Sequence, residues 1–198
     1  MAFVLLFSLL AKMVMHRDQT NNIPLIVMPF VAREPNSSTL ISVDRARGEM
    51  PVLLVSTTEH HKVAGWCNWY RCIETAPLPQ GFPRGNKDAW DALFALTAFL
   101  KTNRNWLIWL QDNVQVLDLY DIPDHDIACL RVGTEHCGMV AYKMKRWVVE
   151  HFVRRIERNM HNTPIDWILD DMRQDLGLTL HRVPKVKTTT SHGQYLRT

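Results

Sequence analysis

The sequence lacks the features that mark several common classes of protein. No apolar run reaches the roughly 20 residues that a bilayer span needs, and the chain has neither an internal repeat nor a low-complexity tract. The four cysteines are spaced too widely for a zinc ribbon, and four in 198 residues are too few to suggest a disulfide scaffold. We therefore expect the cysteines to be reduced and structural.

Charge of one sign is also scarce. Lys and Arg total 23 against 20 Asp and Glu, which gives a net charge of +3. This small excess does not demand nucleic acid and is equally compatible with a small ligand that carries phosphate. The hydrophobic content of 46% is enough to bury one sizeable core and too little for two ordinary domains.

The N-terminus carries the most apolar segment of the chain. Residues 2–15 are nearly all apolar but include Lys12, and no basic start precedes them as in a cleaved signal peptide. For residues 1–22 we expect a helix that packs on the domain or on a second copy. The alternatives are a weak membrane anchor at residues 2–15 or a signal peptide. We expect residues 23–198 to form the domain and the protein to be cytoplasmic.

From Ile23 onward, strand-like and helix-like segments alternate, which is the pattern of an α/β sheet flanked by helices. A loop rich in proline and glycine separates the two halves of this pattern. Strands are expected over residues 24–31, 51–56, 106–110, 127–132 and 178–183, and helices over 38–47, 63–75, 88–101, 143–159 and 164–176.

Two acidic clusters stand out within this pattern. The first, Gln111-Asp112-Asn113, directly follows a buried strand, and ligands of open α/β sheets bind at the carboxyl ends of strands. The second lies in the sequence TPIDWILDD, where Asp166 falls in the first turn of a helix. Asp170 lies one turn later on the same helix face.

These motifs resemble the inverting glycosyltransferases of GT-A fold, most closely the N-acetylglucosaminyltransferase IV group and related bacterial and phage enzymes. That group has a Lys and an Asp before an apolar helix, Glu-Asp-Asp at a strand end, Pro-Ile-Asp-Trp-Leu-Leu-Asp, and a final Gln-His-x-Gly. The counterparts here are Lys87 with Asp91, residues 111–113, residues 164–170 and residues 191–193, together with Arg33 after the first strand.

The resemblance implies a single-domain, GT-A-like (Rossmann-like) α/β fold with a mixed, mostly parallel sheet flanked by helices. It implies transfer of a hexose or N-acetylhexosamine from a nucleotide sugar, with UDP as the carrier, to an acceptor hydroxyl with inversion. The acceptor would be a glycan or a modified DNA base.

The resemblance also implies roles for single residues. A sugar-nucleotide transferase must neutralise the leaving diphosphate and needs a base for the acceptor hydroxyl. Asp166 is the leading candidate for the base and Asp170 is the second. The donor would be bound by Arg33, Lys87, Asp91, Gln111 and Asp112, and a Mn²⁺ or Mg²⁺ ion by Asp112, Asn113 and His192.

Gln111 and Asn113 replace two of the three acids in the family's Glu-Asp-Asp motif. The motif in this chain is therefore DxD-like only in part. A neutral amide oxygen is a poorer ligand for Mg²⁺ or Mn²⁺ than a carboxylate, so a metal-independent site stays open. Basic side chains would then carry the phosphate charge, and the candidates are Arg33, Lys87, Lys185 and Lys187. A catalytically inactive relative of the family is one alternative.

Another alternative is a nucleic-acid-binding protein that uses a basic helix over residues 143–158. Six basic side chains there could form a positive stripe. Glu150 and Glu157 interrupt them, which is typical of an ordinary solvated helix face. The six are Lys143, Lys145, Arg146, Arg154, Arg155 and Arg158.

Overall fold

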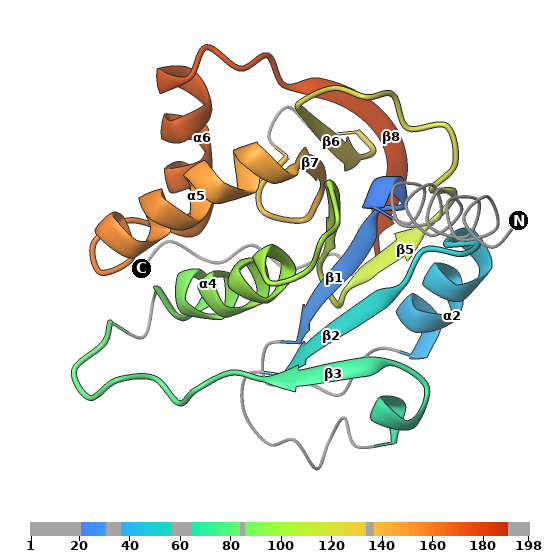
Figure 1. Ribbon diagram of the computed structural model, residues 1–198, viewed down its shortest axis with the longest axis horizontal. Helices are drawn as coiled ribbons and strands as arrows, with labels where there is room; N and C mark the ends of the chain where they lie inside the picture. Colours follow the sequence, from blue (N-terminus) through green and yellow to red (C-terminus); the bar gives the residue numbers. More distant parts are fainter. Residues whose placement is uncertain (1–20, 31–36, 57–64, 84–85, 134–136, 190–198) are drawn as a thin grey trace, which may run out of the picture.

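A mixed eight-stranded sheet forms the centre of the protein (Figure 1). The computed structural model describes residues 21–30, 37–56, 65–83, 86–133 and 137–189. The strands have the spatial order β3-β2-β1-β4-β7-β6-β8-β5. In chain order they are β1 (Leu25–Phe30), β2 (Val52–Ser56), β3 (Arg71–Glu74), β4 (Trp106–Leu110), β5 (Val114–Val116), β6 (Ile127–Arg131), β7 (Ala141–Lys145) and β8 (His181–Thr188).

Strands β3, β2, β1 and β4 are mutually parallel and form one half of the sheet. In the other half, β7 is antiparallel to both β4 and β6, β6 is parallel to β8, and β5 is antiparallel to β8. The expectation of a single α/β domain with a mixed, mostly parallel sheet is therefore confirmed.

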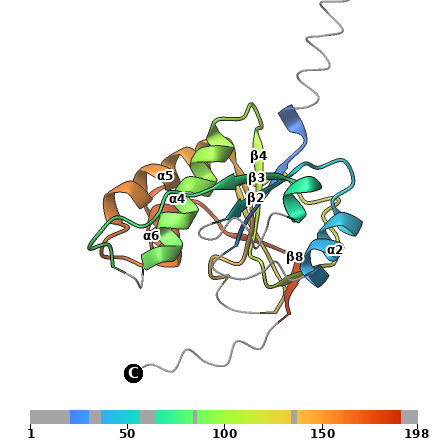
Figure 2. The same cartoon turned by 90° about the horizontal axis from the view of Figure 1, so that it is seen from below.

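Helices cover both faces of the sheet, as the edge-on view in Figure 2 shows. Helix α2 (Ser37–Ala46) lies on one face, and α4 (Lys87–Leu100), α5 (Arg146–Asn159) and α6 (Ile165–Asp175) lie on the other. No helix in the described ranges is long and apolar enough to cross a membrane. The expectations for the N-terminal segment fall on residues 1–20, which are outside the described residues.

The sheet separates two hydrophobic cores because its central strands are apolar on both faces. In β4, Leu107 and Trp109 face the core under α4, α5 and α6, whereas Ile108 and Leu110 face the core under α2. All five β4 side chains are buried. Burial of each such side chain contributes about 1.5–3 kcal/mol, so β4 anchors both layers.

The helix expected over residues 63–75 is wrong. The described part of that range contains a short 3₁₀ helix, η1 (Trp66–Asn68), followed by β3. Trp69, which lies in this range, is 82% exposed. Pairing of β3 with β2 outweighs the local helical spacing, because a buried strand such as β2 needs hydrogen-bond partners on both sides.

The expectation of reduced cysteines is also wrong. Cys67 is bonded to Cys72 and Cys129 to Cys137, with Cα–Cα distances of 5.5 and 6.1 Å. The two residues of each pair are close along the chain, with sequence separations of 5 and 8. Disulfides persist mainly in oxidising compartments. The cytoplasmic expectation stays a prediction.

Candidate active site at the carboxyl edge of the parallel strands

The four parallel strands end at one edge of the sheet, and Asp112 lies there. It follows β4 by two residues. The Thr39 hydroxyl, in the first turn of α2, donates a hydrogen bond of 3.0 Å to the Asp112 carbonyl oxygen. Helices α2 and α4 both begin at this edge because each one runs back to start the next parallel strand.

Hydrogen bonds hold the backbone of the strand-end motif on both sides. The Gln111 amide donates to the Val140 carbonyl at 2.9 Å, and Thr189 donates to the Asn113 carbonyl through its amide and its hydroxyl, each at 2.9 Å. All three side chains of the motif are half-buried. The motif therefore has a fixed position between β7 and the end of β8.

Lys87 and Asp91, both expected to bind the donor, form an ion pair with each other at the start of α4. The Lys87 Nζ to Asp91 Oδ2 distance is 2.6 Å, and Asp91 is 2% exposed. Burial raises the pKa of Asp91 to about 6, although the Lys87 ammonium opposes the shift. The pair makes a rigid, charged start to α4.

Asp166, the candidate base, lies in the first turn of α6 next to the first turn of α4. Burial raises the pKa of Asp88 on α4, Lys87 lowers it, and the negative charge of Asp166 raises it further. The Phe82 ring contacts both the Trp90 ring and the His161 ring, with centroids 5.6 and 5.0 Å apart. These contacts connect the start of α4 to the turn before α6.

Tyr142 of β7 is a buried polar residue that the sequence reasoning missed. It is paired with Trp109 of β4 and is 3% exposed. Burial raises its pKa, and the charges of Asp170 and Asp166 add to the shift. Tyr142 therefore lies between β4, which ends beside Asp112, and the acidic face of α6. The sequence gave no signal for Tyr142, because β7 was not predicted as a strand and its residues AYKMK follow no clear alternation.

Asp170, the second candidate base, lies on α6 within reach of a basic partner. The Arg173 Nε atom is 3.5 Å from Asp170 Oδ1, and the Asp170 side chain is 52% exposed. The negative charge of Asp166, and not that of Asp170, is among the causes that raise the pKa of Asp88. Asp166 is therefore the nearer of the two acids to the start of α4.

The expected metal ligands are described only in part, because His192 lies outside the described residues. Arg33, which was expected to bind the donor, also lies outside them. Among the residues that are described, no group of three or more His, Cys, Asp or Glu side chains could hold a metal ion. Asp112 and Asn113 would contribute one carboxylate and one amide, and the third expected ligand lies outside the described residues, so the metal site stays a prediction.

The six basic side chains considered as a positive stripe over residues 143–158 do not all lie on one helix, because two of them belong to β7. Lys143 belongs to β7 and is 5% exposed; its Nζ donates to the Ile122 carbonyl at 2.8 Å and lies over the Trp106 ring. Most of the other basic side chains are paired with acids. The ion pairs are Lys143 with Asp124, Lys145 with Asp126, Arg146 with Glu150, and Arg155 with Asp175.

Comparisons with known proteins support the fold. No protein-family model and no curated protein sequence matches the chain. The glycosyltransferase GlyE of Streptococcus pneumoniae TIGR4 has a similar structure, with a TM-score of 0.54 and 9% identity over 87% of this chain. Its apo form gives a TM-score of 0.52 and 8% identity over 87% of this chain. This chain spans 55% of the length of GlyE in both cases.

A second similar structure is 4-diphosphocytidyl-2C-methyl-D-erythritol synthase from Anaerococcus prevotii DSM 20548. The TM-score is 0.58 with 9% identity, and the match covers 87% of this chain and 92% of that one. Identities this low establish the fold alone. The chain has a GT-A-like fold, which it shares with a glycosyltransferase and with a protein named as a nucleotide-derivative synthase.

Proposed function

We propose that the protein transfers a hexose or an N-acetylhexosamine from a nucleotide sugar to an acceptor hydroxyl, with inversion and with UDP as the carrier. The observation that carries this proposal is the GT-A-like fold with Asp112 two residues beyond β4, at the carboxyl edge of the parallel strands, where open α/β sheets bind ligands. The aromatic contacts of Phe82 with Trp90 and His161, which join the start of α4 to the turn before α6, also support it.

Asp166 would act as the general base. Its carboxylate accepts the proton of the acceptor hydroxyl while the acceptor oxygen bonds to the anomeric carbon from the face opposite the diphosphate. The bond from the anomeric carbon to the diphosphate oxygen breaks, and its electron pair leaves with the nucleoside diphosphate. Attack from the opposite face inverts the configuration. Asp170, paired with Arg173, lies one helical turn from Asp166 and would be the second candidate for the base.

The donor would lie across the strand-end motif. Gln111 and Asp112 would contact the ribose or the sugar, and Arg33 and the Lys87–Asp91 pair would lie toward the phosphates. A divalent cation bound by Asp112, Asn113 and His192 would supply positive charge for the leaving diphosphate. The described residues do not form its site, so we assign no step to it.

Nucleotidyl transfer is a second candidate function. It is favoured by the synthase comparison, since this chain covers 92% of that protein at the higher TM-score of 0.58. In that chemistry an acceptor oxygen attacks the α-phosphorus of a nucleoside triphosphate, and pyrophosphate leaves. The two functions differ in their donor, a sugar diphosphate or a triphosphate, and this difference is directly testable.

Calorimetric titration with UDP, UDP-glucose, UDP-N-acetylglucosamine and CTP, each with and without Mn²⁺, tests the proposal. Heat with a UDP-sugar supports the transferase, and its dependence on Mn²⁺ decides whether a metal takes part. Heat with CTP alone supports nucleotidyl transfer. If none of the ligands gives heat, the protein is an inactive relative and both proposals fail.

A further inference from the structure

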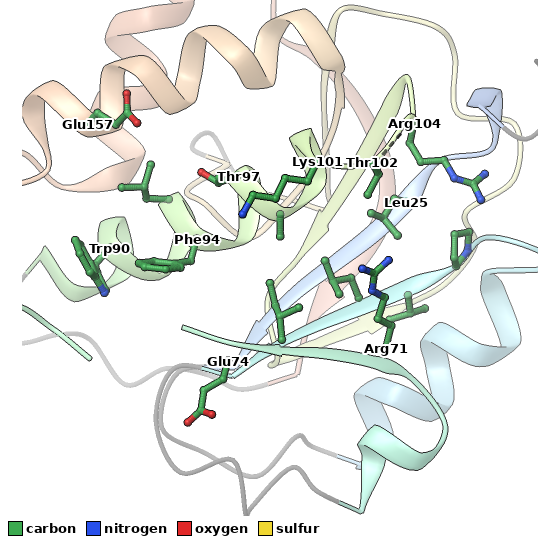
Figure 3. Close-up of a pocket in the computed structure, with 16 residues that line it drawn as sticks. Leu25, Arg71, Glu74, Trp90, Phe94, Thr97, Lys101, Thr102, Arg104 and Glu157 are labelled. Carbon is green, nitrogen blue, oxygen red and sulfur yellow. Dashed lines mark hydrogen bonds between the residues drawn. The ribbon is translucent and has the colours of Figure 1, made fainter. Parts of the chain in front are cut away.

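A groove runs between α4 and the edge strand β3 (Figure 3). Its volume is about 680 Å³, and its lining includes neither Asp112 nor Asp166. This volume lies within the range of about 300–1,000 Å³ that is typical of small-molecule sites. The groove is thus large enough for a ligand of its own, although one end reaches Trp90 in the first turn of α4.

The floor of the groove is apolar and elongated. One wall is a stripe along α4 at the three- and four-residue spacing of a single helix face, and the other wall comes from β1, β2 and β3. From Trp90 to Lys101 the α4 wall is about 16 Å long at 1.5 Å per residue. The apolar lining residues are Leu25, Pro51, Val52, Leu53, Ile73, Trp90, Leu93, Phe94 and Ala98.

Charges are separated along the groove. Arg71, Lys101 and Arg104 lie toward one end, and Glu74 and Glu157 lie toward the other. The separation follows from topology: Arg71 begins β3, and α4 runs antiparallel to β3, so Lys101 after the end of α4 lies near the start of β3. One end of the groove therefore attracts an anion and the other end repels it.

Two of these cations are available to a ligand. Figure 3 shows the Arg71 and Lys101 side chains pointing into the space between β3 and α4. Both residues are exposed, and no ion pair in the described part of the chain involves either one. Arg104 is partly engaged, since its Nη1 donates to the Ile23 carbonyl at 3.2 Å.

We propose that this groove binds a single-chain amphiphile, an acyl or prenyl chain with a carboxylate or phosphate head. The head would pair with Arg71 and Lys101, and the chain would lie along Leu93, Phe94 and Trp90. Glu74 and Glu157 disfavour the reversed orientation. A wholly apolar ligand would leave the two cations without a counterion, and a compact polar anion would leave the apolar floor exposed to water.

Fluorescence titration with cis-parinaric acid and with its methyl ester tests head recognition. We expect saturable binding of the acid at one site and binding at least about tenfold weaker for the ester, because charge-assisted hydrogen bonds are lost. The double variant Arg71→Ala/Lys101→Ala should weaken binding of the acid by a similar factor. Arg154→Ala, which removes an exposed cation on α5, is the matched control and should bind as the wild type does.

Filling the groove tests the apolar wall independently of charge. Ala98→Trp places a large ring in the floor and should abolish binding of the acid while the thermal unfolding curve shows a folded protein. Ile41→Trp on α2, at a site 48% exposed on the other face of the sheet, is the control. Equal affinity for acid and ester, or unchanged affinity in both groove variants, would overturn the proposal.

The source of the amphiphile is tested by sedimentation with vesicles of phosphatidylcholine, alone or mixed with phosphatidic acid. Binding to mixed vesicles that is lost in the Arg71→Ala/Lys101→Ala variant supports the site with a membrane lipid as its ligand. Binding of the free acid without vesicle binding supports a soluble amphiphile. Failure of both arms rejects the site and leaves the proposed transferase activity unaffected.

Discussion

Negative charge is concentrated in the first turns of α4 and α6. Burial raises the pKa of both Asp88 and Asp91; the charge of Asp166 adds to the shift of Asp88, and the charge of Asp88 adds to the shift of Asp91. Lys87 is the nearby cation that offsets part of this charge. Such clusters of perturbed acids are typical of active sites, although structural ion pairs also produce them.

At this scale we expect Asp166→Asn to leave the affinity for UDP nearly unchanged and to lower sugar transfer by about 10²- to 10⁴-fold, because the acceptor proton loses its base. Transfer from a radiolabelled UDP-sugar and calorimetry with UDP measure the two effects. Asp171→Asn, an exposed acid on the same helix, is the control and should retain activity. Turnover at the wild-type rate in Asp166→Asn would remove this residue as the base.

The raised pKa of Asp91 predicts a pH dependence of stability. The pKa is about 6 in the folded protein against an ordinary value of 3.8 for an aspartate, so the folded state binds this proton more tightly than the unfolded chain. The resulting stabilisation is complete below about pH 4 and is lost as the pH rises through about 6. As the pH rises through this window, the unfolding free energy of the wild type should fall. The fall in Asp91→Asn, which lacks the titrating carboxyl, should be smaller by up to about 3 kcal/mol.

Urea unfolding of both proteins at several pH values between about 4 and 7 measures this difference. Equal slopes of unfolding free energy against pH would show that Asp91 does not titrate in this range.

At the scale of elements, a short covalent connection supports the β4–β7 corner of the candidate site. The Cys129–Cys137 disulfide ties β6 to the segment before β7, and the Met139 carbonyl in that segment accepts a hydrogen bond of 3.1 Å from Trp109 Nε1. The same corner carries Tyr142. We therefore expect the position of residues 111–113, which follow β4, to depend on the disulfide between β6 and the segment before β7.

Replacing Cys129 and Cys137 by Ser should lower the unfolding free energy by about 2–3 kcal/mol and weaken donor binding, since the corner beside Asp112 loses its constraint. The double replacement of Cys67 and Cys72 is the control, and it should cost similar stability without a change in donor affinity. Guanidinium unfolding and calorimetry measure the two effects. Mass spectrometry under non-reducing conditions should find no free thiol in the wild type.

The whole molecule depends on two cores separated by one sheet. Phe99 of α4 is fully buried between the sheet and α5 and has the Arg146 guanidinium 5.9 Å from its ring centroid. Phe94 of the same helix is only half-buried, since it lines the groove beside β3. Comparing the loss of stability on removal of each ring therefore distinguishes the contribution of core packing from that of the groove wall.

Phe99→Ala should lower the free energy of unfolding by about 3–5 kcal/mol, and Phe94→Ala by clearly less, because only the first leaves a closed cavity. Chemical denaturation measures both values. Equal losses would mean that Phe94 is as enclosed as Phe99, as it would be if a ligand filled the groove in solution. Extraction and mass spectrometry would then identify an amphiphile that co-purifies with the protein.

The sequence by itself determined the α/β class, the buried strands and the places of the acidic motifs. A continuous apolar run such as residues 106–110 is typical of a strand that is buried on both faces of a sheet. The positions of Asp112 and Asp166 then follow from the predicted end of that strand and the predicted start of the last helix. The resemblance added roles for Arg33 and His192, which lie outside the described residues and stay predictions.

The tertiary structure decided what local spacing could not. Residues 71–74 form a strand because they pair with β2. The paired cysteines lie close enough to bond only in the folded chain. Lys143 is buried because it packs over the Trp106 ring and donates to the Ile122 carbonyl. Tyr142 and the groove beside β3 are likewise visible only once β7, α4 and α6 are packed. In each case the deciding free energy comes from contacts between segments far apart along the chain, which local patterns do not contain.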